Sequence, residues 1–359
     1  MPEGQPALAA AEAFCAAYGL RAPVLLAPMA GACPPSLSRA VARAGGLGAC
    51  GALLMQPEFI AAWAAELRAG GAEGFQINLW IPDPAPARDA ATEDALRRFL
   101  AQWGPPVAPE AGDVGPPDFA AQCEAVLAAA PPVVSSVMGL FAPAYVARIK
   151  AQGIKWFATA TTVAEARAAE DAGADAILAQ GMEAGGHRGT FDAARAEASM
   201  VGLFSLLPAV VDAVKLPVIA TGGIADARGV AAALVLGAAA VQIGTGFLRC
   251  PEAKLPPAWA EALGSARPED TRITRAFSGR AGRGLATAYV RAAAAADAPA
   301  PAPYPVQRGL TQAMRDDALR DDDVERMQAW AGQSARLAPA RPAGEVLREL
   351  WSGARDLLR

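Results

Sequence analysis

The stretch "LPVIATGGIADARGVAAALVLGAAAVQIGTGF", residues 216–247, contains two short apolar runs on either side of an Ala-rich segment. Both runs, 216–223 and 238–247, are rich in branched residues and end in glycines. Near-continuous apolar runs of this length are typical of parallel strands that helices cover. The segment 226–237 between them has the composition of a helix. The stretch therefore predicts a strand–helix–strand unit of a parallel sheet, with a glycine loop after each strand.

The same unit recurs along the chain. Ala-rich helical segments separate eight strand candidates, and a longer Pro-rich excursion to about residue 118 follows the third of them. The candidates are 24–31, 47–54, 74–82, 131–139, 154–160, 174–181, 216–223 and 238–247. Eight such units predict a TIM (β/α)8 barrel. A doubly wound open sheet is the alternative, but its GxGxxG sequence after the first strand is missing.

The composition indicates a large buried core and no charged binding surface. Hydrophobic residues make up 53% of the 359 residues and charged residues 19%, and the net charge is −4. These values exclude global disorder and argue against nucleic-acid binding or attachment to an anionic membrane. The run 229–248 is nearly uncharged and about as long as a bilayer span. Gly237 divides it into a helix and a strand, so we expect a buried pair and no membrane segment.

The cysteines and the start of the chain indicate a cytoplasmic protein. The five cysteines are scattered and form no CxxC pair, as expected of reduced thiols. The opening "MPEGQPALAA" has no basic segment followed by an apolar one, so no secretory signal is expected. Whether the protein is a monomer or a homodimer stays open.

Two glycine loops of the predicted barrel are suited to phosphate. Active sites of this fold lie in the loops after the strands, and the loops after strands 7 and 8 commonly hold phosphate. Here these loops read "TGGI" (221–224) and "IGTGF" (243–247). Glycines let a phosphate approach backbone N–H groups closely, although small residues also ease tight turns. The loops contain no carboxylate that would indicate a metal and no lysine that would indicate a Schiff base, so we expect neither.

The only histidine, His187, follows the sixth predicted strand in the sequence "GGHRG" (185–189). A lone histidine can be a structural residue, but flanking glycines free the backbone to bring the imidazole to a ligand at the barrel mouth. Glu183 or Asp192 could orient its second nitrogen. Arg188 fits either a surface cation or an anion-binding group.

Several motifs together resemble the nitronate monooxygenases, formerly called 2-nitropropane dioxygenases, and in particular their class I branch. They are "APMAG", "AGGLGAC", "INLW", "ATATTVAEAR", "AQGMEAGGHRGTF" and "VQIGTGFL", with "FSGRAGRG" (277–284), "PYPVQ" (303–307) and "WAGQSARL" (330–337) in the tail. The resemblance implies a TIM barrel with a smaller appended domain. It also implies non-covalent FMN and the oxidation of alkyl nitronates, such as propionate 3-nitronate, by molecular oxygen to a carbonyl compound and nitrite.

The resemblance also implies roles for individual residues. His187 would be the catalytic base or would hold the substrate anion, and Tyr304 would line the substrate pocket. The residues expected to bind FMN are Met29, Ala30, Asn78, Gln180, Gly185, Gly222, Gly223, Gln242, Ile243, Gly244 and Thr245. The chain departs from the family pattern at three positions. Ser136 and Met138 replace two aromatic residues, and Arg308 stands where an asparagine is expected, all of which concerns the substrate pocket.

The predicted domains are an FMN-binding barrel (1–262), a smaller domain that covers the substrate (263–332) and a C-terminal helix packing back on the barrel (333–359). The "GRAGRG" motif alone would be read as a flexible basic loop. Two other functions remain open. One is an NAD(P)H-dependent quinone or enoyl-thioester reductase on the same flavin barrel, and the other is a non-catalytic barrel that binds FMN or phosphate.

Overall fold

Eight parallel strands form the centre of the molecule. The computed structural model describes residues 6–359. The strands pair in the order β1-β9-β8-β6-β5-β4-β3-β2, and a bridge between Leu25 and Leu47 joins the two outer strands. They are β1 (Val24–Leu26), β2 (Gly48–Gly51), β3 (Phe75–Trp80), β4 (Val133–Val137), β5 (Lys155–Ala160), β6 (Ala176–Gln180), β8 (Val218–Thr221) and β9 (Ala240–Ile243). Each lies inside a predicted run, so the TIM-barrel prediction is confirmed.

The parallel register brings the polar ends of the strands to one edge of the barrel. Gln180 pairs with Thr221, which in turn pairs with Gln242 on the next strand. On the other side of the barrel, Asn78 pairs with Ser135. The loops that follow these strands therefore open at the same mouth.

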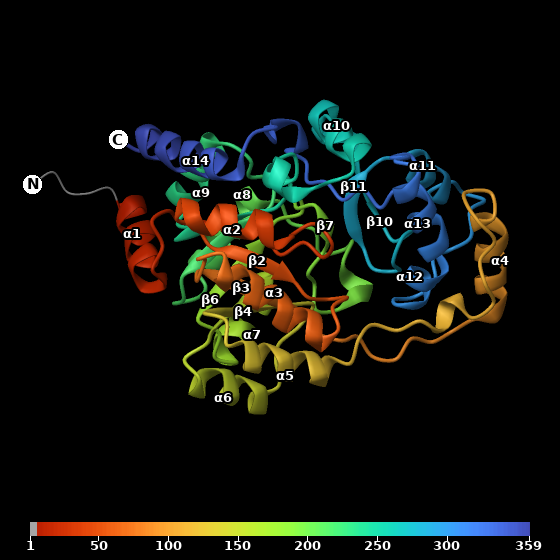
Figure 1. Ribbon diagram of the computed structural model, residues 1–359, viewed down its shortest axis with the longest axis horizontal. Coiled ribbons are helices and arrows are strands. Elements are labelled where there is room, and N and C mark those ends of the chain that lie inside the picture. Colours follow the sequence, from red (N-terminus) through yellow and green to blue (C-terminus); the bar gives the residue numbers. More distant parts are fainter. Residues whose placement is uncertain (1–5) are drawn as a thin grey trace, which may run out of the picture.

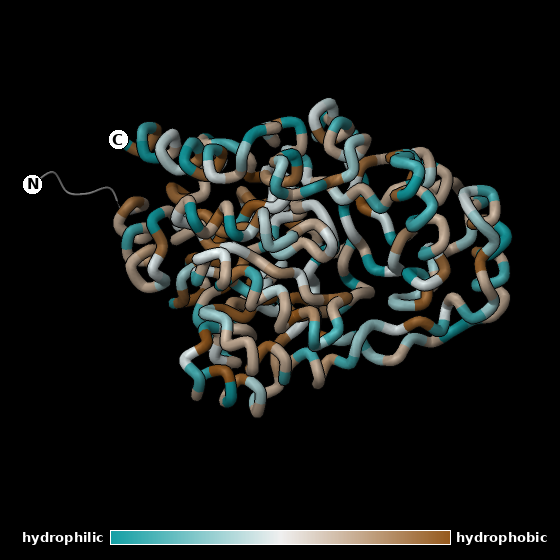
Figure 2. Tube along the Cα trace, viewed as in Figure 1, coloured by the Kyte–Doolittle hydropathy of each residue, from teal (hydrophilic) through white to brown (hydrophobic). Residues whose placement is uncertain are grey.

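Helices surround the barrel because each carries one apolar stripe. In α2, for example, Leu37 and Val41 are fully buried while Arg39 is not. The apolar segments accordingly lie in the interior of the trace (Figure 2). The helices that follow the strands are α2 (Pro35–Ala44), α3 (Pro57–Ala69), α5 (Phe119–Ala129), α6 (Pro143–Ala151), α7 (Val163–Asp171), α8 (Leu203–Val211) and α9 (Ala227–Val235).

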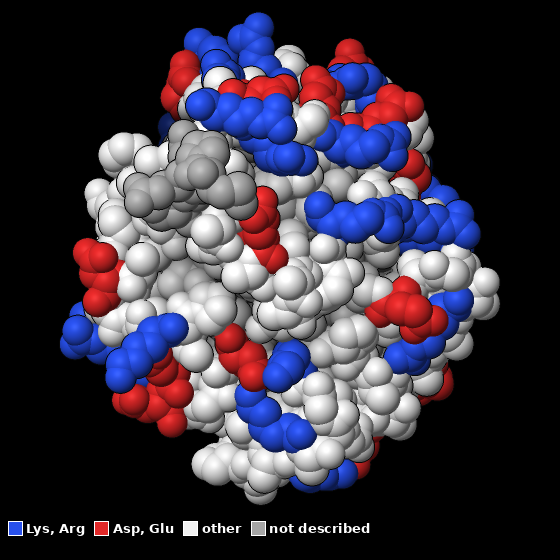
Figure 3. All heavy atoms as spheres, turned by 90° about the vertical axis from the view of Figure 1, so that its left-hand side faces the viewer, with Lys and Arg blue, Asp and Glu red and all other residues white. Residues whose placement is uncertain are grey.

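One further helix closes the end of the barrel opposite the mouth. α1 (Pro6–Tyr18) places Phe14 and Tyr18 against Phe157 of β5, with ring centroids 6.2 and 5.0 Å away. At this end, acidic and basic side chains are interspersed over the surface (Figure 3). α14 (Ala343–Leu357) packs along α2 and α9. Among the described residues no helix has both the length and the apolarity to cross a bilayer.

A second group of elements lies at the mouth end, away from α1 (Figure 1). A three-stranded antiparallel sheet has the order β10-β11-β7. The strands are β7 (Gly186–His187), β10 (Thr271–Thr274) and β11 (Gly282–Leu285). The helices are α4 (Ala90–Leu100), α10 (Pro257–Ser265), α11 (Ala288–Ala293), α12 (Val306–Leu310) and α13 (Gln312–Arg320). Short 3-10 turns are η1 (Ala111–Asp113), η2 (Ala193–Arg195), η3 (Thr245–Phe247), η4 (Pro251–Ala253), η5 (Pro268–Asp270) and η6 (Ala335–Leu337).

This group shares a core with the Pro-rich excursion after β3. Leu96 and Leu100 of α4 belong to the same apolar cluster as Phe277, Tyr289 and Leu310. The domain boundaries at residues 262 and 332 stay a prediction. Because α4 packs into this core, the group at the mouth also includes a segment from within the first 262 residues.

Candidate functional site

His187 lies in a strand. In β7, His187 pairs with Gly282 of β11. The backbone N–H of the next residue, Arg188, donates to the carbonyl of Ala281 at 2.9 Å. The expectation of a free glycine loop around the histidine is therefore wrong. Gly186 has a φ of 78°, which lets the chain turn into this short strand. The interpretation of "GRAGRG" as a flexible basic loop is also wrong, because residues 280–283 are buried and lead into β11.

Two tryptophans and a serine fix the imidazole. The rings of Trp80 and Trp330 meet it edge-on, with centroids 4.9 and 5.0 Å away. Its Nε2 lies 2.7 Å from Ser278 Oγ. That hydroxyl lies 3.3 Å from the Arg280 carbonyl, to which it can donate. When the hydroxyl donates to that carbonyl, Nε2–H donates to Ser278 and Nδ1 carries a lone pair.

The carboxylates expected to orient His187 have other partners. Glu183 accepts the backbone N–H of Leu203 at 2.8 and 3.0 Å, which holds the start of α8. Asp192 accepts the backbone N–H of Ala194 at 2.9 Å, as an N-cap does. The prediction that either one orients the imidazole is wrong, because both carboxylates satisfy nearby helix starts.

The surroundings of His187 disfavour its charged form. Burial is the largest cause and lowers the pKa of the imidazole to about 3, with the positive charges of Arg280, Arg308 and Arg315 acting in the same direction. The free protein therefore holds a neutral imidazole near pH 7. A neutral ring with a free Nδ1 can accept a proton.

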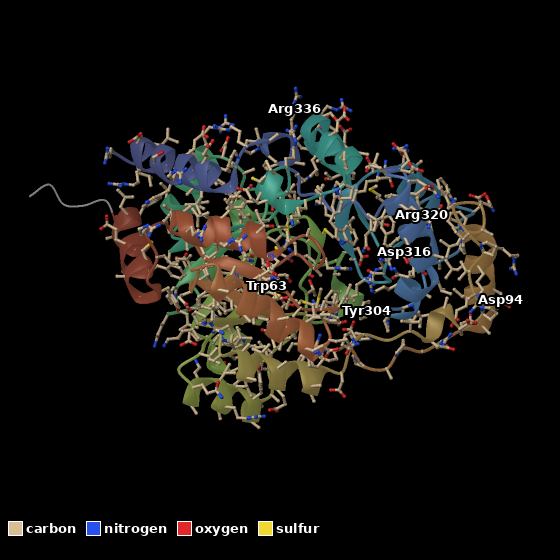
Figure 4. The ribbon with its side chains drawn as sticks, in the orientation of Figure 1. Trp63, Asp94, Tyr304, Asp316, Arg320 and Arg336 are labelled. Atoms are coloured by element: carbon tan, nitrogen blue, oxygen red, sulfur yellow. The ribbon has the colours of Figure 1, made fainter. Side chains whose placement is uncertain are left out.

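Two buried polar atoms beside the histidine have no partner among residues 6–359. Trp80 and Tyr304 stack with centroids 5.1 Å apart and an interplanar angle of 13°. The indole Nε1 of Trp80 and the hydroxyl of Tyr304 are both buried and make no hydrogen bond there. Tyr304 lies where the barrel meets α12 and α13 (Figure 4). A buried polar group without a partner costs roughly 1–3 kcal/mol, so these two atoms indicate a place for a ligand.

Arg280 and Met138 pack against Trp80 beside the histidine. The Arg280 guanidinium forms a two-pronged ion pair with Asp83, at 2.6 and 2.8 Å, and lies 5.6 Å from the Trp80 ring centre. It also contacts the sulfur of Met138, a residue with a left-handed φ of 71°. Ser136, by contrast, accepts the indole N–H of Trp156 at 3.0 Å. Of the two replaced aromatic positions, only Met138 lies against Trp80 and Tyr304.

Arg188 is not a surface cation, while its buried Nε has no partner among residues 6–359, so an anion-binding role stays a prediction. Its side chain is buried and donates to the backbone carbonyls of Gln180, Thr161 and Ser199. Gln180 is also committed to this segment: its side-chain amide donates to the His187 carbonyl at 3.1 Å and accepts the Gly189 N–H at 2.7 Å. Both side chains therefore hold the strand that carries the histidine.

The two glycine loops present free backbone donors. The N–H groups of Gly223, Gly244 and Thr245 donate to no acceptor within the described part of the chain. Gly222 and Gly223 have φ values of 115° and 68°, which only glycine adopts readily. A Cβ on Gly244 would lie 3.2 Å from the sulfur of Met29, so the loop after β1 adjoins the loop after β9.

Residues 332–334 connect the glycine loops after β8 and β9 to the segment that leads into β7. The Gly332 N–H donates to Thr245 Oγ1 at 3.0 Å, and a Cβ on Gly185 would lie only 2.5 Å from the Gly332 nitrogen. Ser334 donates to the Gly223 carbonyl. The structure thus brings Gly185, Gly223 and Thr245 together under residues 332–334.

The remaining predicted cofactor residues lie at the same mouth. Asn78 donates to Ser135 Oγ at 3.1 Å. Gln242 accepts from Gln76 at 2.9 Å, and Gln76 is itself fully buried with an unpartnered Oε1. Ile243 is buried in the barrel core, while Ala30 is exposed in the loop after β1. Their assignment to a cofactor stays a prediction.

Sequence reasoning missed four residues that contact or flank the histidine: Trp80, Ser278, Arg280 and Trp330. They belong to the motifs "INLW", "FSGRAGRG" and "WAGQSARL", which by themselves indicate only a family. Nothing in the sequence alone indicates that these three segments meet at His187, because they lie far apart along the chain.

The sequence is similar to known proteins over nearly its whole length. Residues 12–353 match the protein family described as nitronate monooxygenase. The chain is 38% identical to the nitronate monooxygenase of Pseudomonas aeruginosa over 342 residues, which cover 94% of this chain and 97% of that protein. A probable nitronate monooxygenase of Staphylococcus aureus is 34% identical over 343 residues, which cover 94% and 95%.

Solved structures extend the similarity to the fold. A nitroalkane oxidase from Streptomyces ansochromogenes superimposes with a TM-score of 0.85 at 36% identity, covering 95% of this chain and 98% of that one. FabK from Thermotoga maritima superimposes with a TM-score of 0.74 at 28% identity, covering 96% of each. With a family match over nearly its whole length and relatives above 30% identity, the chain belongs to the nitronate monooxygenase family and is an oxidoreductase.

Proposed function

We propose that this protein binds FMN at the barrel mouth and oxidises alkyl nitronates with molecular oxygen, giving a carbonyl compound and nitrite. The observation that carries the proposal is the pair of unpartnered buried donors, Trp80 Nε1 and Tyr304 OH, next to the single histidine. A planar anion with two oxygens, such as a nitronate, is a suitable acceptor for such donors. The family membership supports the same reaction.

The residues present fit a flavin mononucleotide. Gly223, Gly244 and Thr245 offer free backbone N–H groups in the two loops where this fold commonly holds phosphate. The sequence has one such paired site and no dinucleotide fingerprint, which favours FMN over FAD. Met29 beside Gly244 would lie against the bound group. When bound, FMN supplies the electron acceptor for the substrate and returns the electrons to oxygen.

The side chains around His187 would position the substrate and move one proton. A nitronate arrives already deprotonated, so Trp80 Nε1 and Tyr304 OH need only hold its oxygens. A neutral nitroalkane must first lose its α-proton, and the free Nδ1 of His187 can accept it because the ring is uncharged. Ser278 holds Nε2 and thereby keeps the lone pair on Nδ1.

Oxygen consumption tests the proposal. The purified protein should be yellow, release FMN on denaturation, and consume oxygen with propionate 3-nitronate or another alkyl nitronate without NADH or NADPH. Colourless protein that takes up no FMN on reconstitution would contradict the proposal.

The structural likeness to FabK keeps a second candidate: an NAD(P)H-dependent quinone or enoyl-thioester reductase on the same barrel. Anaerobic mixing separates the two. If the flavin stays oxidised with nitronate but is reduced by NADPH, the reductase is the correct function.

A further inference from the structure

Two glutamine side chains meet in the interior of the barrel. Gln76 of β3 is fully buried, and Gln242 of β9 is 7% exposed. The Nε2 of Gln76 donates to the Leu26 carbonyl of β1 at 3.1 Å and to Gln242 Oε1 at 2.9 Å. Gln76 thereby reaches across the barrel to two neighbouring strands, β1 and β9, with neither of which β3 is paired.

The backbone of β1 fixes the orientation of the Gln76 amide. A carbonyl oxygen can only accept, so the amide turns its nitrogen toward Leu26 and uses its second hydrogen for Gln242. Its Oε1 is left without a partner in residues 6–359. The opposite orientation would place Oε1 against the Leu26 carbonyl, with two acceptors together, and would lose both hydrogen bonds.

Gln76 in turn fixes the amide of Gln242. Because Oε1 of Gln242 faces the Gln76 donor, its Nε2 points away from Gln76. This Nε2 makes no hydrogen bond within the described part of the chain and, unlike Gln76 Oε1, it is not fully buried. Gln242 is the last residue but one of β9, whose end lies at the mouth. The free amide N–H groups of Gln242 therefore open toward the mouth, two residues before Gly244.

We propose that Gln76 is a positioning residue for the cofactor: it fixes the Gln242 amide so that this side chain offers hydrogen-bond donors, and not an acceptor, to bound FMN. This inference rests on the proposed function for the identity of the bound group. The carbonyl oxygens and unprotonated ring nitrogens of a flavin are acceptors, which free amide N–H groups complement. A glutamine without Gln76 beside it could turn either its oxygen or its nitrogen toward the mouth.

Gln242→Glu tests which atoms are offered to the cofactor. An ionised glutamate has the same shape but only acceptors. One oxygen keeps the bond from Gln76, which also favours the ionised form, while the other replaces the free N–H groups. The dissociation constant of FMN, measured by flavin fluorescence as the apoprotein is reconstituted at pH 8, should rise about 10-fold or more. An unchanged dissociation constant would overturn the proposal.

A double-mutant cycle tests whether Gln76 acts through Gln242. Gln76→Leu removes the group that fixes the amide, so FMN should bind about 3- to 10-fold more weakly. Gln242→Leu removes the donors outright. The double variant should then bind FMN no more weakly than Gln242→Leu alone, because nothing is left for Gln76 to position. Independent losses that multiply in the double variant would mean that Gln76 acts only on the fold, and would overturn the proposal.

Gln122→Leu is the matched control. Gln122 is 4% exposed and donates to two backbone carbonyls, those of Ala52 at 2.9 Å and Met55 at 2.8 Å, but to no side chain. Its replacement should lower the stability to urea while the dissociation constant of FMN stays within about twofold. Gln242→Glu keeps the interior contact with Gln76, so it tests the proposal independently of whether Gln76→Leu folds.

Oxygen consumption with an alkyl nitronate separates this proposal from the reaction itself. If FMN binding depends on Gln76 through Gln242 but no nitronate is oxidised, the proposed reaction fails and the role of Gln76 stands. If nitronates are oxidised but Gln76→Leu binds FMN as tightly as the native protein, the role of Gln76 is wrong and the function stands. Native apoprotein that binds no FMN would contradict both.

Discussion

At the residue scale, His187 is held as an uncharged imidazole. Trp80 and Trp330 pack edge-on against its ring, and burial with nearby arginines lowers its pKa to about 3. A base with so low a pKa is a weak proton acceptor in the free protein. The neutral state compensates in part, because the ring needs no deprotonation before it accepts a proton.

His187→Asn should affect nitroalkanes far more than nitronates. The neutral substrate must lose a proton, and a positioned base contributes typically about 10²–10⁴-fold to such a step. We expect kcat/KM for a nitroalkane to fall within that range, while nitronate turnover falls much less and the flavin stays bound. Steady-state kinetics with both substrate forms measures this. Ser278→Ala, which frees Nε2, should give a smaller loss of the same kind, and equal losses on both forms would instead assign His187 to holding the anion.

The same residue sets the pH dependence. The folded-state pKa lies below the ordinary value, so His187 is unprotonated above about pH 3 and takes up a proton only as the pH falls through that value. Between pH 5 and 8, kcat/KM for a neutral nitroalkane should therefore show no loss on the acidic side due to His187. A profile with an acidic pKa near 6.5 that disappears in His187→Asn would contradict the neutral, buried ring.

At the element scale, local sequence patterns predict the barrel strands but not the short strands at the mouth. The strands carry their signal in themselves, because runs such as 216–223 must be apolar to be buried on both faces. β7 contains only Gly186 and His187, and a two-residue strand has no periodicity to detect. Its existence depends on pairing with β11, about 95 residues later, which no local pattern encodes.

The glycine loop after β8, where we propose that the flavin phosphate binds, gives a prediction at this scale. Gly223→Val places a branched side chain at φ 68°, with its Cβ about 3.1 Å from the Glu183 side chain and beside the free N–H groups. We expect the variant to lose flavin during purification, as measured by absorbance at equal protein concentration. Gly19→Val is the matched control: Gly19 has a φ of 65° and open space around it, so the variant bears a similar backbone strain but should keep its flavin. Equal flavin content in the two variants would rule out a phosphate at Gly223.

At the scale of the whole molecule, stability and chemistry lie at opposite ends of the barrel. α1 closes one end with Phe14, which is 3% exposed, while the candidate site occupies the other. The closing helix was missed because its sequence, rich in alanine throughout, shows little amphipathic pattern. The second group of elements at the mouth was expected from the family resemblance, and α4 joins it from an excursion that showed no clear pattern.

Phe14→Ala should destabilise the protein without affecting the reaction. Removing a buried phenyl ring typically costs about 3–5 kcal/mol, while the site at the far end keeps its contacts. Urea unfolding should show that loss, and kcat/KM at 25 °C should stay within about twofold. Phe59→Ala on α3 is the control, since Phe59 is 59% exposed and its removal should cost less than about 0.5 kcal/mol. A large loss of activity in folded Phe14→Ala would mean that the two ends are coupled.

The pairing of β7 with β11 also bears on how such an enzyme can be re-engineered or diversify. The histidine lies between two barrel strands in the sequence, but the residues that hold it, Gly282 and Ser278, lie after the last barrel strand. A chimaera that takes residues 271–332 from a relative would replace these contacts. It would thereby change the strand pairing of His187 and the hydrogen bond of its imidazole. The barrel and residues 271–332 are therefore not interchangeable modules. In any redesign, the residues of β7 and of β11 must be selected together.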